Sequence, residues 1–134
     1  RVLLTADVWV AGAGNSNIGL NVGDVVTNQG VLWGPIDSST WSFDPSVISA
    51  RDNQRRYVKV APGEMVGRRV TVKIWVDLDH QQTWGSISNG SNTYTTEKVA
   101  IARSDLRSVL VMQYGQKMDV DNISLRRTLG PGRR

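Results

Sequence analysis

The chain has 134 residues, of which 40% are apolar, with no cysteine and a formal net charge of +4. This length predicts one domain with a core of its own, and the lack of cysteine excludes disulfides, thiolate catalysis and cysteine-ligated zinc. There is no apolar run of membrane-spanning length and no signal-peptide pattern, and because the chain starts at Arg1 we expect a processed piece of a longer protein.

All the predicted elements are β-strands. Segments rich in Val, Thr, Trp and Ile are separated by turn signals of Gly, Asn, Ser and Pro, and none has the period of an amphipathic helix. In chain order the expected strands are 2–10, 17–22, 30–33, 56–61, 68–78, 93–102, 107–114 and 118–126. About eight strands without helices predict an all-β fold, an antiparallel β-sandwich of the jelly-roll type.

This sandwich is expected to cover residues 1–128, followed by a basic flexible tail at 129–134. The stretch 23–55 is difficult to assign to strands, and we expect part of it to be a large functional loop.

Three of the predicted strands carry an aromatic residue on their polar side. In 2–10 the alternation places Trp9 with Asp7, away from the valines. In 56–61 Tyr57 lies opposite the valine side, and in 68–78 Trp75 does the same. Polar neighbours expected on the face of Trp75 are Arg69, Lys73 and Asp77.

Two interpretations of these outward aromatic rings remain open. Chain 23–55, or the long stems of lysine and arginine on adjacent strands, would cover them. Alternatively, the rings form a platform on which sugar rings stack, while polar neighbours bind the sugar hydroxyls. In that case Trp84, in the predicted loop 80–90, would close over the face. The predicted ligand-binding residues are Trp9, Tyr57, Arg69, Lys73, Trp75, Asp77 and Trp84.

The last strand, MDVDNISLRR (118–127), changes its alternation in the middle. Val120 is expected to be buried, and so are Ile123 and Leu125, which have the other parity. A β-bulge at Asp121 and Asn122 is the simplest explanation.

VDNISL (120–125) resembles the closing strand of jelly-roll carbohydrate-binding modules, the galactose-binding-like sandwiches attached to xylanases and other glycoside hydrolases. VKVAPGEMVGRRVTVKIWVDL (58–78) is similar to their central segment, and LLTADVWVAG (3–12) to their opening segment, although Val8 and Trp9 stand where Phe and Glu are usual. The resemblance implies carbohydrate binding without catalysis. It also implies a structural calcium ion held by Asp121 and Asp7, whose hard oxygen atoms suit that ion.

Enzymatic interpretations find little support in the residues. Asp77, Asp79 and His80 resemble a metal or acid–base cluster, but polar residues are also expected where a strand ends. Glu64 and Glu97 are the only glutamates, and AGAGNSNIG (11–19) lacks the third glycine of a dinucleotide-binding loop. We therefore expect no enzyme.

Charge divides the chain and suggests a second function. Residues 1–50 have a net charge of −3 and residues 51–134 one of +7. No nucleic-acid motif accompanies the basic clusters, so nucleic acid is not an expected partner. A structural module of a virion, such as a phage capsid-decoration or tail protein, would instead bury the outer aromatics against neighbouring subunits. Both functions predict an extracellular or virion-associated location.

Overall fold

The computed structural model describes residues 1–10, 15–21, 30–34, 40–46, 56–59, 67–100, 108–114 and 118–128, and the side chains of 1–9, 67–98, 100 and 119–128. Every regular element in these residues is a strand, which confirms the prediction of an all-β fold. None of them forms a helix that would be long and apolar enough to cross a membrane. The predicted tail at 129–134 and most of the predicted loop at 23–55 lie outside these residues.

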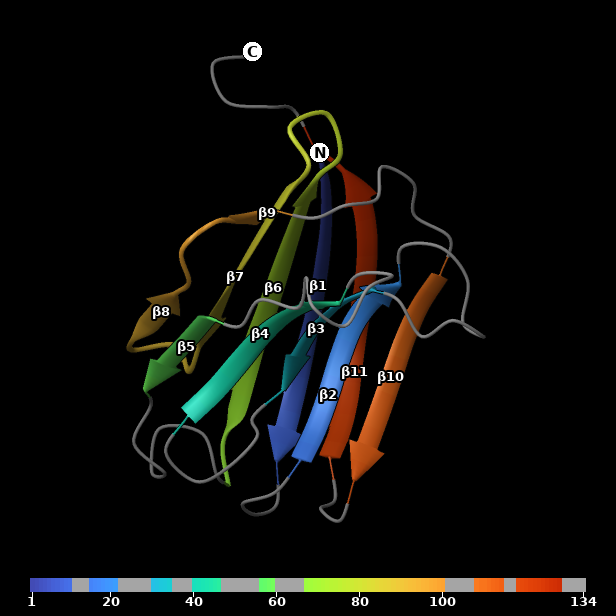
Figure 1. The fold of residues 1–134 in the computed structure, drawn as a ribbon. Helices are drawn as coiled ribbons and strands as arrows, with labels where there is room; N and C mark the ends of the chain where they lie inside the picture. Colours follow the sequence, from blue (N-terminus) through green and yellow to red (C-terminus); the bar gives the residue numbers. More distant parts are fainter. Residues whose placement is uncertain are drawn as a thin grey trace.

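The described strands follow one another along the chain without an intervening helix (Figure 1). They are β1 (Val2–Val10), β2 (Asn15–Asn21), β3 (Gly30–Gly34), β4 (Thr40–Ser46), β5 (Arg56–Lys59), β6 (Arg69–Asp77), β7 (Gln82–Ser88), β8 (Thr93–Thr95), β9 (Val99–Ala100), β10 (Ser108–Tyr114) and β11 (Met118–Arg127).

These strands form two sheets in which every pairing is antiparallel. The first sheet has the order β11-β1-β6-β7-β8, with β9 also paired to β7, and the second has the order β10-β2-β3-β4-β5. The two ends of the chain therefore run together twice: β1 pairs with β11 in the first sheet, and β2 pairs with β10 in the second (Figure 1).

Two strands were not expected from the sequence, and in the expected strand 93–102 the structure has two short strands, β8 and β9. β4 contains Pro45, a residue typical of turns. The neighbouring strand β5 pairs only with Thr40 to Phe43 of β4, so the missing N–H of Pro45 removes no hydrogen bond to β5. β7 was expected to be a loop because it contains Gln, Gly and Ser. Thr83, Gly85 and Ile87 form a buried side with the period of a strand, and Ser86 on the other side is buried too.

The described core lies on one face of the first sheet. Register places Leu4 opposite Ile74 and Val8 opposite Val70, and all four side chains are almost completely buried. Ala6, Val72, Val76 and Ile87 are buried as well. The alternation in 2–10 and 68–78 therefore predicted the buried face of β1 and β6 correctly.

The expectation for β11 was right about the bulge and wrong about burial. Thr5 pairs with Ser124 and Asp7 with Asp121, so two residues of β11, Asn122 and Ile123, lie opposite the single residue Ala6. Asn122 has a φ of +53°. Ile123 and Leu125, however, are each 49% exposed. β11 lies at the edge of the first sheet, and an edge position leaves one flank of its side chains open to solvent.

Candidate functional site

The polar face of the first sheet carries the predicted ligand-binding residues at two separate ends. It consists of the odd-numbered side chains of β1 and β6, together with their neighbours on β7 and β11. Trp9 pairs with Arg69 at one end, and Leu3 pairs with Trp75 at the other. These positions are six residues apart along β6, or ~20 Å of strand, so Trp9 and Trp75 do not form one continuous aromatic surface.

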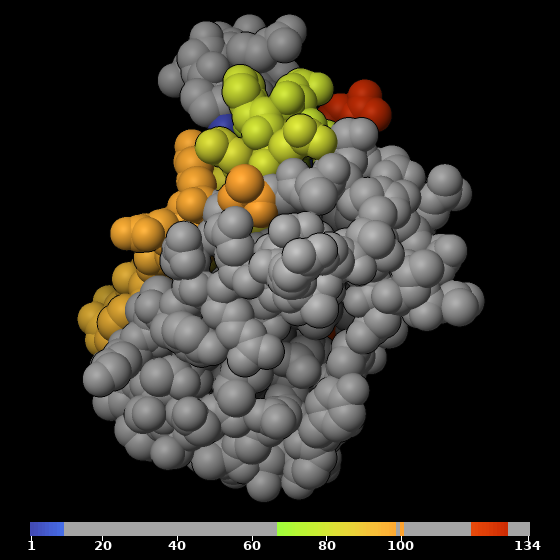
Figure 2. Space-filling model, in the orientation of Figure 1, coloured from blue at the N-terminus to red at the C-terminus, as the bar shows by residue number. Residues whose placement is uncertain are grey.

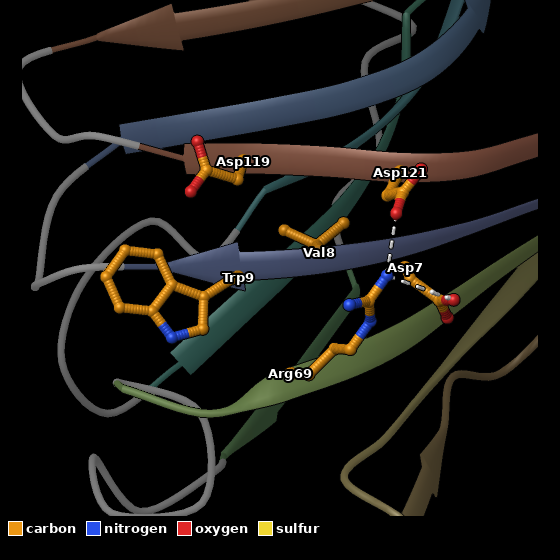
Figure 3. Close-up of a pocket in the computed structure, with 6 residues that line it drawn as sticks. All are labelled: Asp7, Val8, Trp9, Arg69, Asp119 and Asp121. Atoms are coloured by element: carbon orange, nitrogen blue, oxygen red, sulfur yellow. Dashed lines mark hydrogen bonds and ion pairs between the residues drawn. The ribbon is translucent and has the colours of Figure 1, made fainter.

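The first end contains a pocket of about 260 Å³. Its lining comes from β1, β6 and β11, and Figure 3 shows Arg69 of β6 reaching across β1 toward Asp121 of β11. The residues that line it are Asp7, Val8, Trp9, Arg69, Asp119 and Asp121. We call this the aspartate pocket.

Arg69 lies between two carboxylates of this pocket. Its Nη2 donates a hydrogen bond of 2.9 Å to Oδ2 of Asp121 and lies 3.8 Å from Oδ2 of Asp7. The side chains of Arg69 and Asp121 are 59% and 69% exposed. An ion pair this open to water contributes ~0–1 kcal/mol to stability. A ligand can therefore replace the contact between Arg69 and Asp121 at little cost in free energy.

Asp7 is held more firmly than Asp121. Thr71 Oγ1 donates to its Oδ1 and Asn122 Nδ2 donates to its Oδ2, each at 2.8 Å. The bond from Asn122 is the main cause that lowers the pKa of Asp7, followed by the bond from Thr71, while partial burial acts in the opposite direction and the charge of Arg69 adds to the lowering. Asp7 is therefore an ionised hydrogen-bond acceptor at neutral pH.

Asn122 organises this arrangement and was not among the predicted site residues. Its left-handed backbone, with the φ of +53°, turns its amide toward Asp7, and its own N–H donates to Oδ1 of Asp121 at 2.8 Å. Asparagine tolerates this conformation better than most residues. The sequence carried a signal for it, because the parity change at Asp121 and Asn122 marked the bulge. Asp119, two residues before Asp121, and Val8 line the pocket and were also not among the predicted site residues.

The predicted calcium ligands, Asp7 and Asp121, do come together, since they are paired across β1 and β11. All four of their carboxylate oxygens, however, already accept hydrogen bonds from protein donors: Thr71, Asn122 and Arg69. Among the described side chains no group of three or more His, Asp or Glu is arranged to hold a metal ion. Calcium would have to displace Arg69, and calcium binding stays a prediction.

The second end of the polar face is built around two tryptophans. Trp75 and Trp84 are paired across β6 and β7, with ring centroids 5.9 Å apart and planes 12° from parallel. Trp84 therefore belongs to a strand, and its expected position in a loop was wrong. The Arg1 guanidinium carbon lies 4.9 Å from the centroid of the Trp84 ring, and Lys98 Nζ lies 4.6 Å from it.

Asp77 supports this end from within the protein. It is only 6% exposed. Its carboxylate accepts a hydrogen bond from the backbone N–H of His80 at 3.2 Å and contacts Nδ1 of the His80 ring at 3.0 Å. It also forms an ion pair with the Arg1 guanidinium at 3.7 Å. Burial is the largest influence and raises the pKa of Asp77, but the two contacts with His80 and the charge of Arg1 together outweigh it, and the net pKa is lowered. Asp77 is therefore engaged by protein donors rather than open to a ligand.

The remaining two predicted residues lie apart from these ends. Lys73 is exposed on the polar face, between Arg69 and Trp75 on β6. Tyr57 lies on β5 of the second sheet, so it does not share a sheet with Trp9 and Trp75, and its side chain is outside the described set.

Figure 2 shows the yellow-green turn that joins β6 and β7 at the same end of the molecule as the blue N-terminal residues, where Arg1 meets Asp77.

Comparison with protein families, with curated proteins and with solved structures finds no match to this chain. The assignment of a function therefore rests on the geometry of the two ends.

Proposed function

We propose that the chain is a non-catalytic carbohydrate-binding module and that the aspartate pocket holds one sugar ring. The single observation that carries the proposal is the position of Trp9, which lines the same pocket as Arg69 and three aspartates. An aromatic ring beside a few convergent polar groups is the usual composition of a small-ligand site.

The chemistry of the pocket suits a sugar in three ways. The indole of Trp9 offers a flat surface to the apolar face of a sugar ring. The exposed carboxylates of Asp119 and Asp121 accept hydrogen bonds from hydroxyl groups, and Arg69 donates to hydroxyl or ring oxygens. The volume of about 260 Å³ is below the ~300–1,000 Å³ of drug-sized sites, which favours a single ring over a buried oligosaccharide.

The hydrogen bonds of the pocket favour binding over hydrolysis. A glycosidase requires one carboxyl group that keeps its proton and donates it to the leaving oxygen. In the aspartate pocket hydrogen bonds from Asn122 and Thr71 lower the pKa of Asp7, so Asp7 does not keep a proton to donate. Asp121 already accepts from the Arg69 guanidinium.

The proposed fold for this module is an antiparallel sandwich of the jelly-roll type. Its support is that both chain ends contribute to both sheets and that β4 of the second sheet approaches β7 of the first. The side chains of Leu4 to Val8 on β1 and of Val70 to Val76 on β6 that point to one face of the first sheet are also buried, and Figure 1 draws the second sheet across the first. A second apolar sheet would provide this cover.

The test is affinity electrophoresis through gels that contain soluble polysaccharides, followed by calorimetric titration with the strongest binder. We expect Trp9→Ala to weaken binding by about tenfold or more, because stacking supplies ~1 kcal/mol or more beyond area burial. Tyr94→Ala, which removes a half-buried aromatic ring from β8, is the matched control and should retain affinity. Binding by no polysaccharide, or unchanged affinity of Trp9→Ala, would contradict the proposal.

One observation favours the alternative, a structural module of a virion. Ile123 and Leu125 are half-exposed on the edge strand β11, where a neighbouring subunit would bury them. Sedimentation velocity distinguishes the two: a stable oligomer that Leu125→Lys dissociates supports the structural module, and a monomer that binds sugar opposes it. An extracellular location fits the first function, and a virion-associated one the second.

A further inference from the structure

The two ends of the polar face differ in charge. The aspartate pocket has three acids, Asp7, Asp119 and Asp121, around one base, Arg69. The opposite end has Arg1 and Lys98 beside Trp84, and the exposed Lys73 precedes Trp75 by two residues on the same face. Asp77 is the acid that contacts this group, and it is buried and bonded to His80 and Arg1.

The positive charge that remains available at this end belongs to the two lysines and to Arg126, which is exposed on β11 opposite Leu3. Arg1 is only 14% exposed and lies 3.7 Å from Asp77, so its charge is largely compensated. Lys98 Nζ lies over the Trp84 ring, and both lysines are exposed. An exposed cation–π contact is worth only ~0.5–1 kcal/mol, so Lys98 remains free to bind an anion as well.

The tryptophan pair gives this anion site an apolar wall. Trp75 and Trp84 are both partly exposed, and their nearly parallel rings lie opposite each other on adjacent strands. Lys73 precedes the pair on β6, and Lys98 lies over Trp84 itself. A group that combines a flat, partly apolar ring with a negative charge is complementary to such a surface.

We propose that the ligand is an anionic polysaccharide, with a carboxylate or sulfate bound between Lys73 and Lys98 against Trp75 and Trp84. This inference rests on the proposed carbohydrate function and specifies the class of glycan. A neutral sugar of the same polysaccharide occupies the aspartate pocket, because the carboxylates of the pocket repel an anion. Lys73 lies four residues from Arg69 on β6, or ~13 Å, so one extended glycan reaches both ends and is oriented by their opposite charges.

The experiment compares anionic and neutral glycans on the whole chain. Partially methyl-esterified polygalacturonate, its fully methyl-esterified form, a glucuronoxylan and a neutral xylan are tested by calorimetric titration at low and moderate salt. Both anionic polymers then carry neutral rings beside charged ones, as the two ends require. We expect at least one of the two anionic polymers to bind more tightly than either neutral polymer, with affinity that falls as salt rises. The double variant Lys73→Gln/Lys98→Gln should lose roughly three- to tenfold in affinity for that polymer, and Trp75→Ala should weaken it too.

Two controls separate charge at this site from charge in general. Lys98→Arg keeps the charge and should retain most of the affinity. Arg127→Gln removes one positive charge from the other parity of β11, opposite Val2, and should change little. All variants are checked for an unchanged melting temperature, so that a loss of binding is not a loss of fold.

The outcomes that overturn the inference differ from those that overturn the proposed function. Equal or tighter binding of the neutral polymers, or unchanged affinity of the double variant, overturns the anionic assignment and leaves the carbohydrate function standing. Binding of polyuridylate as tight as that of the anionic glycan overturns it as well, because the surface would then select polyanions rather than sugars. Failure to bind any polysaccharide rejects the proposed function itself.

Discussion

The two ends of the polar face belong to the same strands, yet they use their polar groups differently. At the tryptophan end Asp77 binds Arg1 and His80 and is only 6% exposed, and Leu3 is 5% exposed, although both lie on the outward parity, so the groups left open there are basic. At the aspartate pocket Arg69 and Asp121 stay more than half exposed in an ion pair that a ligand can replace. The comparison teaches that parity identifies a face, whereas availability to a ligand depends on which neighbours already use each group.

The largest effect is expected where the protein uses its own polar groups. Asp77→Ala removes a buried carboxylate and leaves Arg1 without its counter-charge, so we expect a loss of ~2–4 kcal/mol in the free energy of unfolding. Urea denaturation provides the measurement. Asp79→Ala, an exposed aspartate two residues further along, is the control and should change stability by less than ~0.5 kcal/mol. Similar losses in the two variants would contradict the structural role of the tryptophan end.

A smaller effect is expected at the bulge of the aspartate pocket. Asn122→Ala removes the hydrogen bond to Asp7 and places a residue that disfavours φ of +53° in the bulge, so we expect a loss of ~1–2 kcal/mol. Asn122→Gly removes the same hydrogen bond without the backbone strain and should be the more stable variant by up to ~1 kcal/mol. If both variants lose equally, backbone strain at this position contributes nothing. Denaturation and glycan affinity are measured together, because misplacement of Asp7 and Asp121 should also weaken binding.

Acid should affect both ends in the same direction. The pKa values of Asp7 and Asp77 are lowered in the folded chain, so the native state holds fewer protons than the unfolded state. The resulting stability is complete above the unfolded pKa of ~4 and is lost as the pH falls through the native values. Denaturation from pH 7 to pH 2 should show this decline, and Asp7→Asn should flatten part of it. A wild-type stability that rises as the pH drops below ~4 would contradict these directions.

The smallest effect is expected from removal of metal. Because Arg69 supplies the positive charge between Asp7 and Asp121, we expect EDTA to leave the melting temperature of the wild type unchanged. Arg69→Ala leaves the two carboxylates without this charge, and calcium should then raise its melting temperature. A fall in the wild-type melting temperature with EDTA would instead support the structural calcium that the resemblance to carbohydrate-binding modules predicts.

Strands could be predicted from the sequence where apolar and polar side chains alternate strongly. They could not be predicted where a polar segment becomes a strand only through its pairing with neighbouring strands. The bounds of β1 matched the prediction, because five apolar side chains alternate through it. β7 was missed, since its strand character comes from its position between β6 and β8 and from buried Thr83, whose hydroxyl donates to the carbonyl of Trp75. Burial of Ile123 and Leu125 was predicted wrongly because the sequence does not show that β11 is an edge strand.

The site was predicted in its components but not in its grouping. Parity placed Trp9 and Asp7 on the polar side of one strand and Arg69 on that of another, and the resemblance to carbohydrate-binding modules brought Asp121 together with Asp7. The register between β1 and β6, which separates Trp9 from Trp75, cannot be deduced from the sequence. Nor can the sheet to which Tyr57 belongs. Those facts depend on which strands pair, a property of the whole chain rather than of any segment.

The most direct test of the central claim is a two-dimensional ¹H–¹⁵N spectrum of the five indole N–H groups, recorded while the strongest polysaccharide binder is titrated in. Each signal is assigned by a single Trp→Phe substitution. We predict that the Trp9 signal shifts and saturates with the affinity measured by calorimetry. A saturating titration in which the Trp9 signal does not move, while other tryptophans respond, would contradict a sugar site in the aspartate pocket.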